Sequence, residues 1–557
     1  MPGRGAHPSR GTGGGLTAFG LIFAVLWLLH LWLLRLPYFW DEAGYFIPAA
    51  RDILLTGDLI PHTTLSNAHP PLVMLWLALC WKLTTYSPLV TRTAMLLVAA
   101  FGFTGLWLLA RRVANAQVAT ATVVLTALSP TVFAQSAMAQ LDIAAFALVL
   151  WMLYAHICGR HWQAIAFAAL AAVAKETTVA VTLTLLGADL MGWFAARWWP
   201  RWGGKWFLPR RTLGQCAGWL LALLPLVGWY AYHFHRTGHV FGNPDYLRYN
   251  VGATVTPLRI LLAGVMRLWH VTGYMNLFVL TGAALLLLWD TRRTGVMGNA
   301  ATPLPAAGAR PAASALAPNV QLLFALVVLA QVAEFSIVGG ALLARYMIPA
   351  VPLVVLPAVD VLHRYAPKWK WWIAGCAAAF VVALFFNPPW FISPEDNLTW
   401  ARFVNMHEQA ARYVEQHYAE DRILTAWPAS DELNRPFLGY VAKPLTVVRM
   451  ESFTAEEILR AAQQEENFDV VVAFSTKYEP PRGFFQHIPG WTYVQTRYFD
   501  FHQDLPPKAI ARMLHGRIVW QKASPGEWIA VIEIDKIRNA RSEKFRPFES
   551  EKSQDWR

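Results

Sequence analysis

The chain has 557 residues, of which 56% are hydrophobic and 15% are charged, and its mean hydropathy is +0.34. This composition excludes an ordinary water-soluble protein and indicates a membrane protein. The formal net charge of +12 is accounted for by basic residues between membrane spans, so we expect no nucleic-acid partner.

Long apolar runs recur as far as Asn387 and predict a polytopic α-helical membrane protein with about eleven spans. We expect these spans at residues 16–34, 91–110, 118–135, 141–157, 162–175, 177–194, 213–233, 271–289, 319–338, 342–362 and 371–387. Beyond Asn387 the charges are evenly spread and no run is long enough to cross a bilayer. The sequence therefore predicts a membrane domain over residues 1–387 and a soluble domain over residues 388–557.

The Lys and Arg residues between the expected spans collect on one face of the membrane. They favour a cytoplasmic N-terminus, because basic loops are retained inside. The opposite face then receives the loops 35–90 and 234–270 and the soluble C-terminal domain.

The outer loop 35–90 contains a second apolar piece, LVMLWLALCWKL, directly after His69-Pro70-Pro71. Its dozen residues are too few for a span, and counting it as one would invert the charge bias of every later loop. Proline suits the first turn of a helix. We therefore expect two shallow interfacial helices in this loop, one of them starting near Pro71.

The C-terminal domain alternates helical and strand-like patterns. Residues 406–418 and 454–466 have helical periods, whereas residues 422–428, 468–474, 516–523 and 527–535 are apolar and β-branched. This alternation predicts a small α/β sheet domain.

Ionisable residues gather at the outer ends of the expected spans. Asp41 and Asp142 are acidic, and Lys175 and Arg345 are basic. Asp41 alone could be a general base, a metal ligand, a partner of a buried cation or merely the cap of the helix that follows. Four such groups on one face favour a site for a substrate that combines a phosphate with a group that loses a proton.

Several short motifs occur in a characteristic order: DE at 41–42, HPP at 69–71, SPTVFAQSAMAQLD at 129–142, AKE at 174–176 and RYMIP at 345–349. This order, over residues 16–365, resembles that of GT-C superfamily glycosyltransferases, in particular protein O-mannosyltransferases and lipid A aminoarabinose transferases. The resemblance implies an outward-facing cavity that binds a polyprenyl-phosphate-linked sugar. The soluble part is C-terminal, as in the bacterial relatives, which implies a multi-pass protein of the inner membrane.

The resemblance also implies roles for individual residues. Asp41 matches the catalytic carboxylate, with Glu42 beside it, and Asp142 matches a second acidic position. His69, Lys175 and Arg345 match positions near the donor phosphate, although aminoarabinose transferases have Lys where this chain has His69. A second tier of cavity residues comprises Tyr45, Tyr246, Arg248 and Tyr346; the loop that carries Tyr246 and Arg248 could equally be a plain surface connection.

The expected reaction moves a sugar from the lipid phosphate to an extracytoplasmic acceptor in one inverting displacement. The acceptor could be a protein hydroxyl, lipid A or another envelope glycan, and membrane lipids surround the chain. No dense ligand spacing indicates a metal, so a divalent metal stays open and no other cofactor is expected. The main alternative is a transporter or lipid flippase, and an anchored adhesin or scaffold ranks last.

Overall fold

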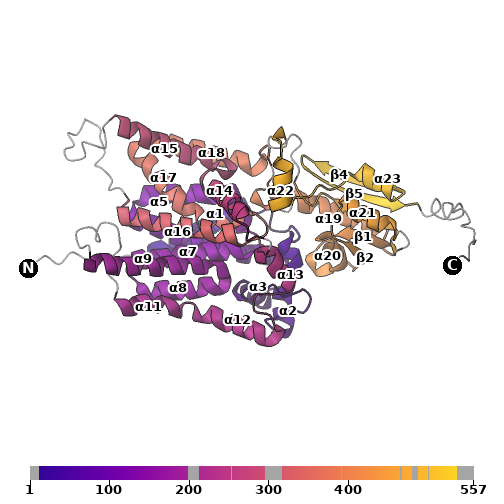
Figure 1. Cartoon of the computed structure of the whole chain (residues 1–557), viewed down its shortest axis with the longest axis horizontal. Helices are drawn as coiled ribbons and strands as arrows, with labels where there is room; N and C mark the ends of the chain where they lie inside the picture. The colour runs from indigo at the N-terminus through magenta and orange to yellow at the C-terminus, as the bar shows by residue number, and fades with distance from the viewer. Residues whose placement is uncertain are drawn as a thin grey trace, which may run out of the picture. The chain divides into compact units, whose positions relative to one another are not determined.

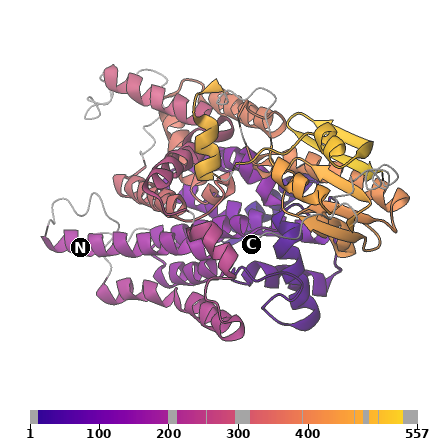
Figure 2. The same ribbon diagram turned by 45° about the vertical axis from the view of Figure 1, so that its right-hand side comes forward.

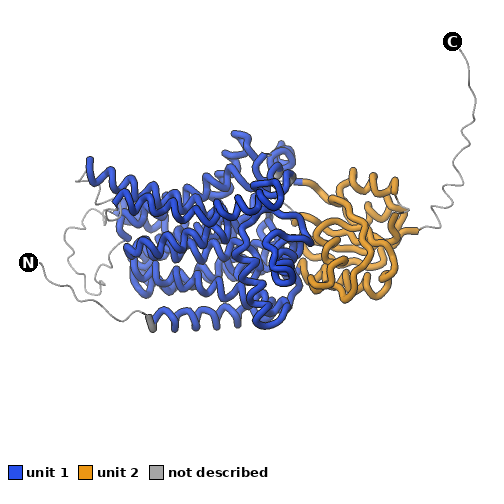
Figure 3. The backbone as a smooth tube through the Cα atoms, turned by 90° about the horizontal axis from the view of Figure 1, so that it is seen from below, with its two compact units in different colours: residues 1–402, 483–501 blue, residues 403–482, 502–557 orange. Residues whose placement is uncertain are grey.

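The computed structural model (Figure 1) describes residues 12–198, 212–252, 254–294, 316–390, 392–464, 467–478, 487–499 and 501–535. Two compact units are distinguished in Figure 3: unit 1 contains Met1–Arg402 and Gly483–Phe501, and unit 2 contains Phe403–Arg482 and His502–Arg557. The domain boundary expected between residues 387 and 388 stays a prediction, because a division into compact units does not show which residues lie in a membrane.

The regular secondary structure among the described residues of unit 1 is helical. In chain order its elements are α1 (Thr12–Leu29), η1 (Glu42–Phe46), α2 (Ile47–Thr56), α3 (Leu72–Leu83), α4 (Pro88–Val113), α5 (Ala116–Leu128), α6 (Pro130–Ser136), α7 (Leu141–Ile157), α8 (His161–Ala174), η2 (Glu176–Thr178), α9 (Val179–Trp198), α11 (Leu213–Leu221), α12 (Leu224–Thr237), α13 (Pro244–Leu247), η3 (Arg248–Gly252), α14 (Pro257–Thr272), η4 (Tyr274–Asn276), α15 (Leu277–Arg293), α16 (Pro318–Ile337), η5 (Ala344–Met347), α17 (Val351–Tyr365), α18 (Trp369–Phe385), η6 (Pro394–Asp396) and α22 (Trp491–Phe499).

Five helical stretches of the described chain are long and apolar enough to cross a membrane, and a sixth is added if α5 and α6, bent by 75°, form one span. The five are Pro88–Val113, Glu176–Trp198, Leu213–Thr237, Pro257–Arg293 and Pro318–Ile337. Helices α1, α7, α8 and α18 are apolar but shorter. The structure therefore supports a helical membrane protein, whereas the expected number of about eleven spans is not confirmed.

The long helices of unit 1 run side by side (Figures 1 and 2), with α4 packed between α1, α5 and α7. Helices α4 and α7 approach closely at Gly102, where an added Cβ would lie 2.8 Å from the Cα of Ala147. Small residues at this crossing let the two backbones meet, as is typical of helices packed in membranes. This contact matters for the site, because α7 begins with the segment that carries Asp142.

Local signals explain where several helices begin. The hydroxyl of Ser87 accepts from the backbone N–H of Val90 at the start of α4, and the Asn115 side chain accepts from two N–H groups at the start of α5. The two helices expected in the outer loop are present as α2 and α3. In the segment 234–270, expected as an outer loop, residues 257–270 belong to helix α14, which the sequence pattern had not indicated.

Unit 2 is built on a five-stranded sheet in the order β2-β1-β3-β5-β4. Its strands are β1 (Arg422–Ala426), β2 (Thr446–Met450), β3 (Val470–Phe474), β4 (Gly516–Ser524) and β5 (Glu527–Ile534). Strands β2 and β3 pair parallel to β1, while β5 pairs antiparallel to β3 and β4. Helix α19 (Thr399–His417) begins in unit 1 and ends in unit 2. The described residues of unit 2 also form α20 (Ala429–Asn434), η7 (Pro436–Leu438), α21 (Ala455–Ala462) and α23 (Pro507–Met513). A small α/β sheet domain is thus present as expected, with β2 as a strand that the sequence pattern had not indicated.

Candidate functional site

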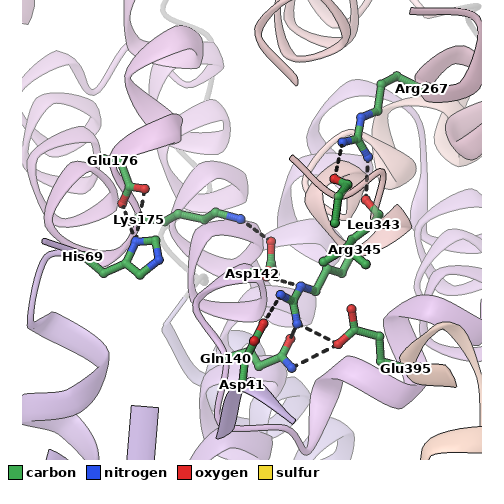
Figure 4. A network of polar contacts seen from close by, with 11 residues as sticks. Asp41, His69, Gln140, Asp142, Lys175, Glu176, Arg267, Leu343, Arg345 and Glu395 are labelled. Atoms are coloured by element: carbon green, nitrogen blue, oxygen red, sulfur yellow. Dashed lines mark hydrogen bonds and ion pairs between the residues drawn. The ribbon is translucent and has the colours of Figure 1, made fainter. Parts of the chain in front are cut away.

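Arg345, in the 3-10 turn η5, is the centre of a buried polar network in unit 1 (Figure 4). Its Nη2 donates to Asp41, and its Nη1 donates to Gln140 Oε1 at 2.5 Å and to Glu395 Oε2 at 2.6 Å. Its Nε lies 3.6 Å from Asp142 Oδ2. One guanidinium therefore joins segments that are separated by more than three hundred residues of sequence.

Lys175 extends this network on the opposite side of Asp142. Its Nζ donates to Asp142 Oδ1 at 2.5 Å, and it lies 4.4 Å from the centre of the Tyr346 ring. Helix α8 ends at Ala174, so Lys175 is the extended residue that follows the last turn. This break lets a cation at the end of an apolar helix reach a carboxylate, and the ion pair offsets the cost of burying its charge.

The two central carboxylates differ sharply in exposure. The Asp41 side chain is 33% exposed, whereas that of Asp142 is 5% exposed. Asp142 is also held by both Lys175 and Arg345. An incoming molecule can therefore reach Asp41 more readily, while Asp142 is placed to hold the two cations in position.

Asp41 does not act as a helix cap. It occupies the residue before the π-helical turn η1, but its side chain accepts no hydrogen bond from the backbone of that turn. The preceding residue, Trp40, has a φ of +43°, which is uncommon for a residue with a large side chain. A strained residue on one side and a π-helical turn on the other therefore hold Asp41 toward Arg345.

Glu42 is fully buried and has a different set of partners. It accepts from the backbone N–H of Phe39 at 2.9 Å and of Ala139 at 2.6 Å, and it pairs with Arg92 at 3.3 Å. Arg92 also donates to the Pro37 and Ala137 carbonyls at 2.7 and 3.1 Å. We propose that Glu42 is a structural brace, in place of the catalytic role expected for it, because it ties the Asp41 turn to the segment before α7.

Two buried arginines of α14 hold the loop that leads to Arg345. Arg267 donates to the carbonyl of Leu343 at 2.5 Å, and Arg259 donates to those of Gly339 and Gly340, both at 2.9 Å. The Leu343 carbonyl also accepts from the backbone N–H of Tyr346 at 3.4 Å. The charge-assisted hydrogen bonds from the two arginines stabilise the irregular backbone where it is buried. The position of η5, and with it Arg345, depends on α14.

His69 lies on the far side of Lys175 from Arg345 (Figure 4). Its Nδ1 is 3.2 Å from Glu176 Oε1, and its ring meets Tyr45 edge to face at a centroid distance of 5.8 Å. Tyr45 is buried. The structure therefore places His69 and Tyr45 with Glu176, one residue beyond Lys175, rather than against Arg345.

The remaining second-tier residues have different surroundings. The Tyr346 ring stacks on that of Phe335 at a centroid distance of 5.2 Å, and Lys175 Nζ lies over the Tyr346 ring. Arg248 is exposed at the start of η3. Tyr246 belongs to α13, but its side chain falls outside what the structure describes. Within the described residues, no three His, Cys, Asp or Glu side chains are grouped so as to hold a metal ion.

Sequence reasoning missed Gln140, Glu395, Arg92 and Arg267. Gln140 directly precedes the LD of a recognised motif, and Arg92 is an arginine at the start of an apolar run, so both carried a usable signal. Glu395 lies in an evenly charged stretch that was assigned to the soluble domain. Only the contact with Arg345 reveals its place in the site.

Burial shifts the titration of the two adjacent acids of η6. It raises the pKa of Glu395 to about 7, with Arg345 opposing the shift and Asp41 adding to it. It also raises the pKa of Asp396 to about 6, although Tyr274 donates a hydrogen bond to this carboxylate at 2.6 Å. Near neutral pH, Glu395 is thus close to an even balance between its charged and neutral forms.

No family model matches the sequence, and no curated protein sequence matches it either. Among solved structures, the chain is similar to ArnT from Cupriavidus metallidurans bound to undecaprenyl phosphate, with 15% identity, a TM-score of 0.53, and 94% of this chain and 98% of that chain covered. The apo state of the same protein gives a TM-score of 0.50 at 15% identity, with 93% and 98% covered. AglB from Archaeoglobus fulgidus, in complex with an inhibitory peptide and a dolichol-phosphate, gives a TM-score of 0.40 at 11% identity, with 83% and 69% covered.

ArnT is a lipid A aminoarabinose transferase and a GT-C enzyme. The resemblance expected from the motif order is therefore confirmed at the level of the fold, and it extends over almost the whole chain. The alternative of a transporter or flippase gains no support from these comparisons. The chain is therefore a helical membrane protein whose fold is similar to that of ArnT.

Proposed function

We propose that the protein is an integral-membrane glycosyltransferase, which moves a sugar from a polyprenyl-phosphate donor to an extracytoplasmic acceptor with inversion at the anomeric carbon. One observation carries this proposal: the partly exposed carboxylate of Asp41 contacts Arg345. Arg345 and Lys175 lie on either side of Asp142 and both contact it. Two cations beside one accessible base suit a substrate that carries a phosphate and reacts with a hydroxyl.

Arg345 and Lys175 would bind the donor phosphate. Both are nearly buried, with side chains 6% and 8% exposed, so their attraction to an anion is weakened little by water. Asp142 lies between them and holds both. Charge that develops on the departing phosphate would be stabilised by groups that are already in place.

Asp41 would act as the general base. The acceptor hydroxyl gives its proton to Asp41 as its oxygen forms a bond to the anomeric carbon. The bond from that carbon to the phosphate oxygen breaks, and its electron pair leaves with the polyprenyl phosphate. If the acceptor is itself a phosphate, as on lipid A, little deprotonation is needed and Asp41 would orient the acceptor.

The site must face the compartment that holds the acceptor. We place the N-terminus in the cytoplasm and the C-terminal domain outside the inner membrane, because the basic residues between spans favour this orientation. The domain assignment, 1–387 in the membrane and 388–557 outside it, follows from the same argument. A contact of His69 with the phosphate stays a prediction, since its ring meets Glu176.

The function can be tested with the purified full chain in lipid nanodiscs. An envelope lipid extract supplies polyprenyl-phosphate sugars together with lipid acceptors, and mass spectrometry follows the release of polyprenyl phosphate. The parent should release it, and the Asp41→Asn variant should not. Equal release with both proteins would remove Asp41 as the base, and no release with either, even when protein acceptors are added, would contradict the transferase.

A further inference from the structure

Both Nη groups of Arg345 are engaged in this structure, whereas its Nε lies 3.6 Å from Asp142 Oδ2 without a hydrogen bond. Its Nη1 serves Glu395 and Gln140, and its Nη2 serves Asp41. A phosphate that binds both Nη groups with two oxygens needs one of these contacts to open. The structure therefore raises the question of which side chain gives way to the donor.

The three carboxylates around Arg345 differ in how else they are held. Asp142 has Lys175 as a second cation at 2.5 Å. Asp41 is the proposed base and must stay. Glu395 is held besides Arg345 by the amide of Gln140 at 3.2 Å, and it belongs to η6, a three-residue turn on the connection between α18 and α19. Of the two carboxylates that are not the proposed base, Glu395 is thus the one that has no second cation to hold it.

The charge balance of the site also disfavours an ionised Glu395 beside a bound phosphate. Asp41, Asp142 and Glu395 supply three negative charges against two positive charges from Arg345 and Lys175. A phosphodiester adds one more negative charge in a site whose side chains are mostly buried. With the phosphodiester bound, these groups carry a net charge of −2 if Glu395 is ionised and of −1 if it is neutral, and uncompensated charge is costly in a buried site.

The groups around Glu395 act on its proton in opposite directions. Arg345 favours the ionised form, whereas Asp41 and Asp396 oppose it, and burial opposes it most strongly. When a phosphate shares Arg345, the stabilisation of ionised Glu395 weakens and the proton is held more firmly. The charged and titratable groups that face this turn are Arg345 of η5, Asp41 before η1, Asp142 of α7, Asp396 of η6, Tyr274 of η4 and Arg267 of α14.

We propose that Glu395 holds Arg345 in the unliganded protein as a stand-in for the donor phosphate, and that donor binding displaces it in the protonated form. Glu395 is then a positioning residue. It keeps Arg345 in its binding geometry when no donor is present, and it couples donor binding to the uptake of one proton. This inference rests on the proposed function, because it takes a lipid phosphate as the ligand of Arg345.

The test measures binding of a polyprenyl methyl phosphate diester to the full chain in nanodiscs. The diester keeps its single charge from about pH 5.5 to about pH 8.5, so any dependence on pH in that range comes from the protein. For the parent we expect the affinity to weaken above about pH 7, approaching tenfold per pH unit for one proton. In weakly buffered solution near pH 7.5, the parent should take up about one proton per diester bound, and a pH indicator measures this.

The Glu395→Gln variant keeps the shape of the side chain and removes its charge. Its affinity should vary little with pH, it should exceed that of the parent near pH 8, and binding should take up no proton. The matched control is Glu408→Gln, which removes a carboxylate from a surface pair with Arg412 and should retain the parental slope.

The outcomes separate the two claims. Diester binding by the parent with a flat pH profile and no proton uptake would overturn the inference and leave the proposed function standing. A parental slope in Glu395→Gln would overturn it as well, since the proton would then belong to another group. No binding of the diester by the parent at any pH would contradict the proposed function and the inference together.

Discussion

Asp41→Asn separates the chemical role of this carboxylate from its structural one. The substitution keeps the shape of the side chain and a hydrogen-bond acceptor for Arg345 Nη2, and it removes the base. Because Asp41 does not cap η1, no cap is lost. Arg345 still has Gln140 and Glu395 as partners.

The expected cost in stability is small and the expected cost in rate is large. The Asp41 side chain is one third exposed, so losing its ion pair should destabilise the protein by no more than about 1 kcal/mol. Losing a general base lowers the rate by about a hundredfold or more, which corresponds to roughly 2.7 kcal/mol in the activation barrier. Donor affinity should stay the same or improve, because one negative charge leaves the neighbourhood of the phosphate.

The assay compares turnover and donor KM for the parent, Asp41→Asn and a matched control in nanodiscs. The control is Asp58→Asn, in the same outer loop. The Asp58 carboxylate pairs with Arg236 at 2.6 Å and is not part of the Arg345 network. We expect the control to be near-parental and Asp41→Asn to lose turnover with an unchanged or lower KM. Near-parental turnover by Asp41→Asn would refute the reasoning and make Asp142 the leading acid.

Three further predictions concern the phosphate-binding cations, the Glu42–Arg92 pair and the orientation in the membrane. Lys175→Ala and Arg345→Ala should each weaken binding of polyprenyl phosphate by about 1.5–3 kcal/mol, roughly ten- to hundredfold; parental binding by both would make these residues structural. Arg92→Leu strands the buried carboxylate of Glu42 and should destabilise the protein by about 3–5 kcal/mol, seen as a lower midpoint of thermal unfolding in detergent, and an unchanged midpoint would contradict the brace. A reporter that is active only outside the cytoplasm should work when fused after Arg557, and strong activity of a cytoplasm-only reporter there would reverse the proposed orientation.

The convergence of the charged residues could be predicted from the sequence. Asp41, Asp142, Lys175 and Arg345 each stand at the end of an apolar run, and charges are placed there only at a cost. The positive-inside pattern assigned all four ends to one face, and the structure brings the four side chains into one network. Their roles in catalysis stay proposals.

The parts that sequence reasoning missed depend on contacts between distant segments. Glu395 looks like any surface acid until the chain brings η6 to η5. Arg259 and Arg267 interrupt an apolar stretch, so their segment resembled a loop; in the folded chain both arginines are buried because backbone carbonyls of the 339–343 segment accept their hydrogen bonds. Strand β2 has five residues and a half-exposed pattern, which gives a weak periodic signal.

The most direct test of the central claim compares the envelope of cells that contain the protein with that of cells that lack it. Mass spectrometry of glycolipids and glycoproteins should show one sugar missing from one acceptor in cells without the protein, together with accumulation of the matching polyprenyl-phosphate sugar. Restoring the parent chain should reverse both changes, and restoring Asp41→Asn should reverse neither. Identical envelope glycans and unchanged levels of the lipid-linked sugars in both kinds of cell would contradict the proposed transferase.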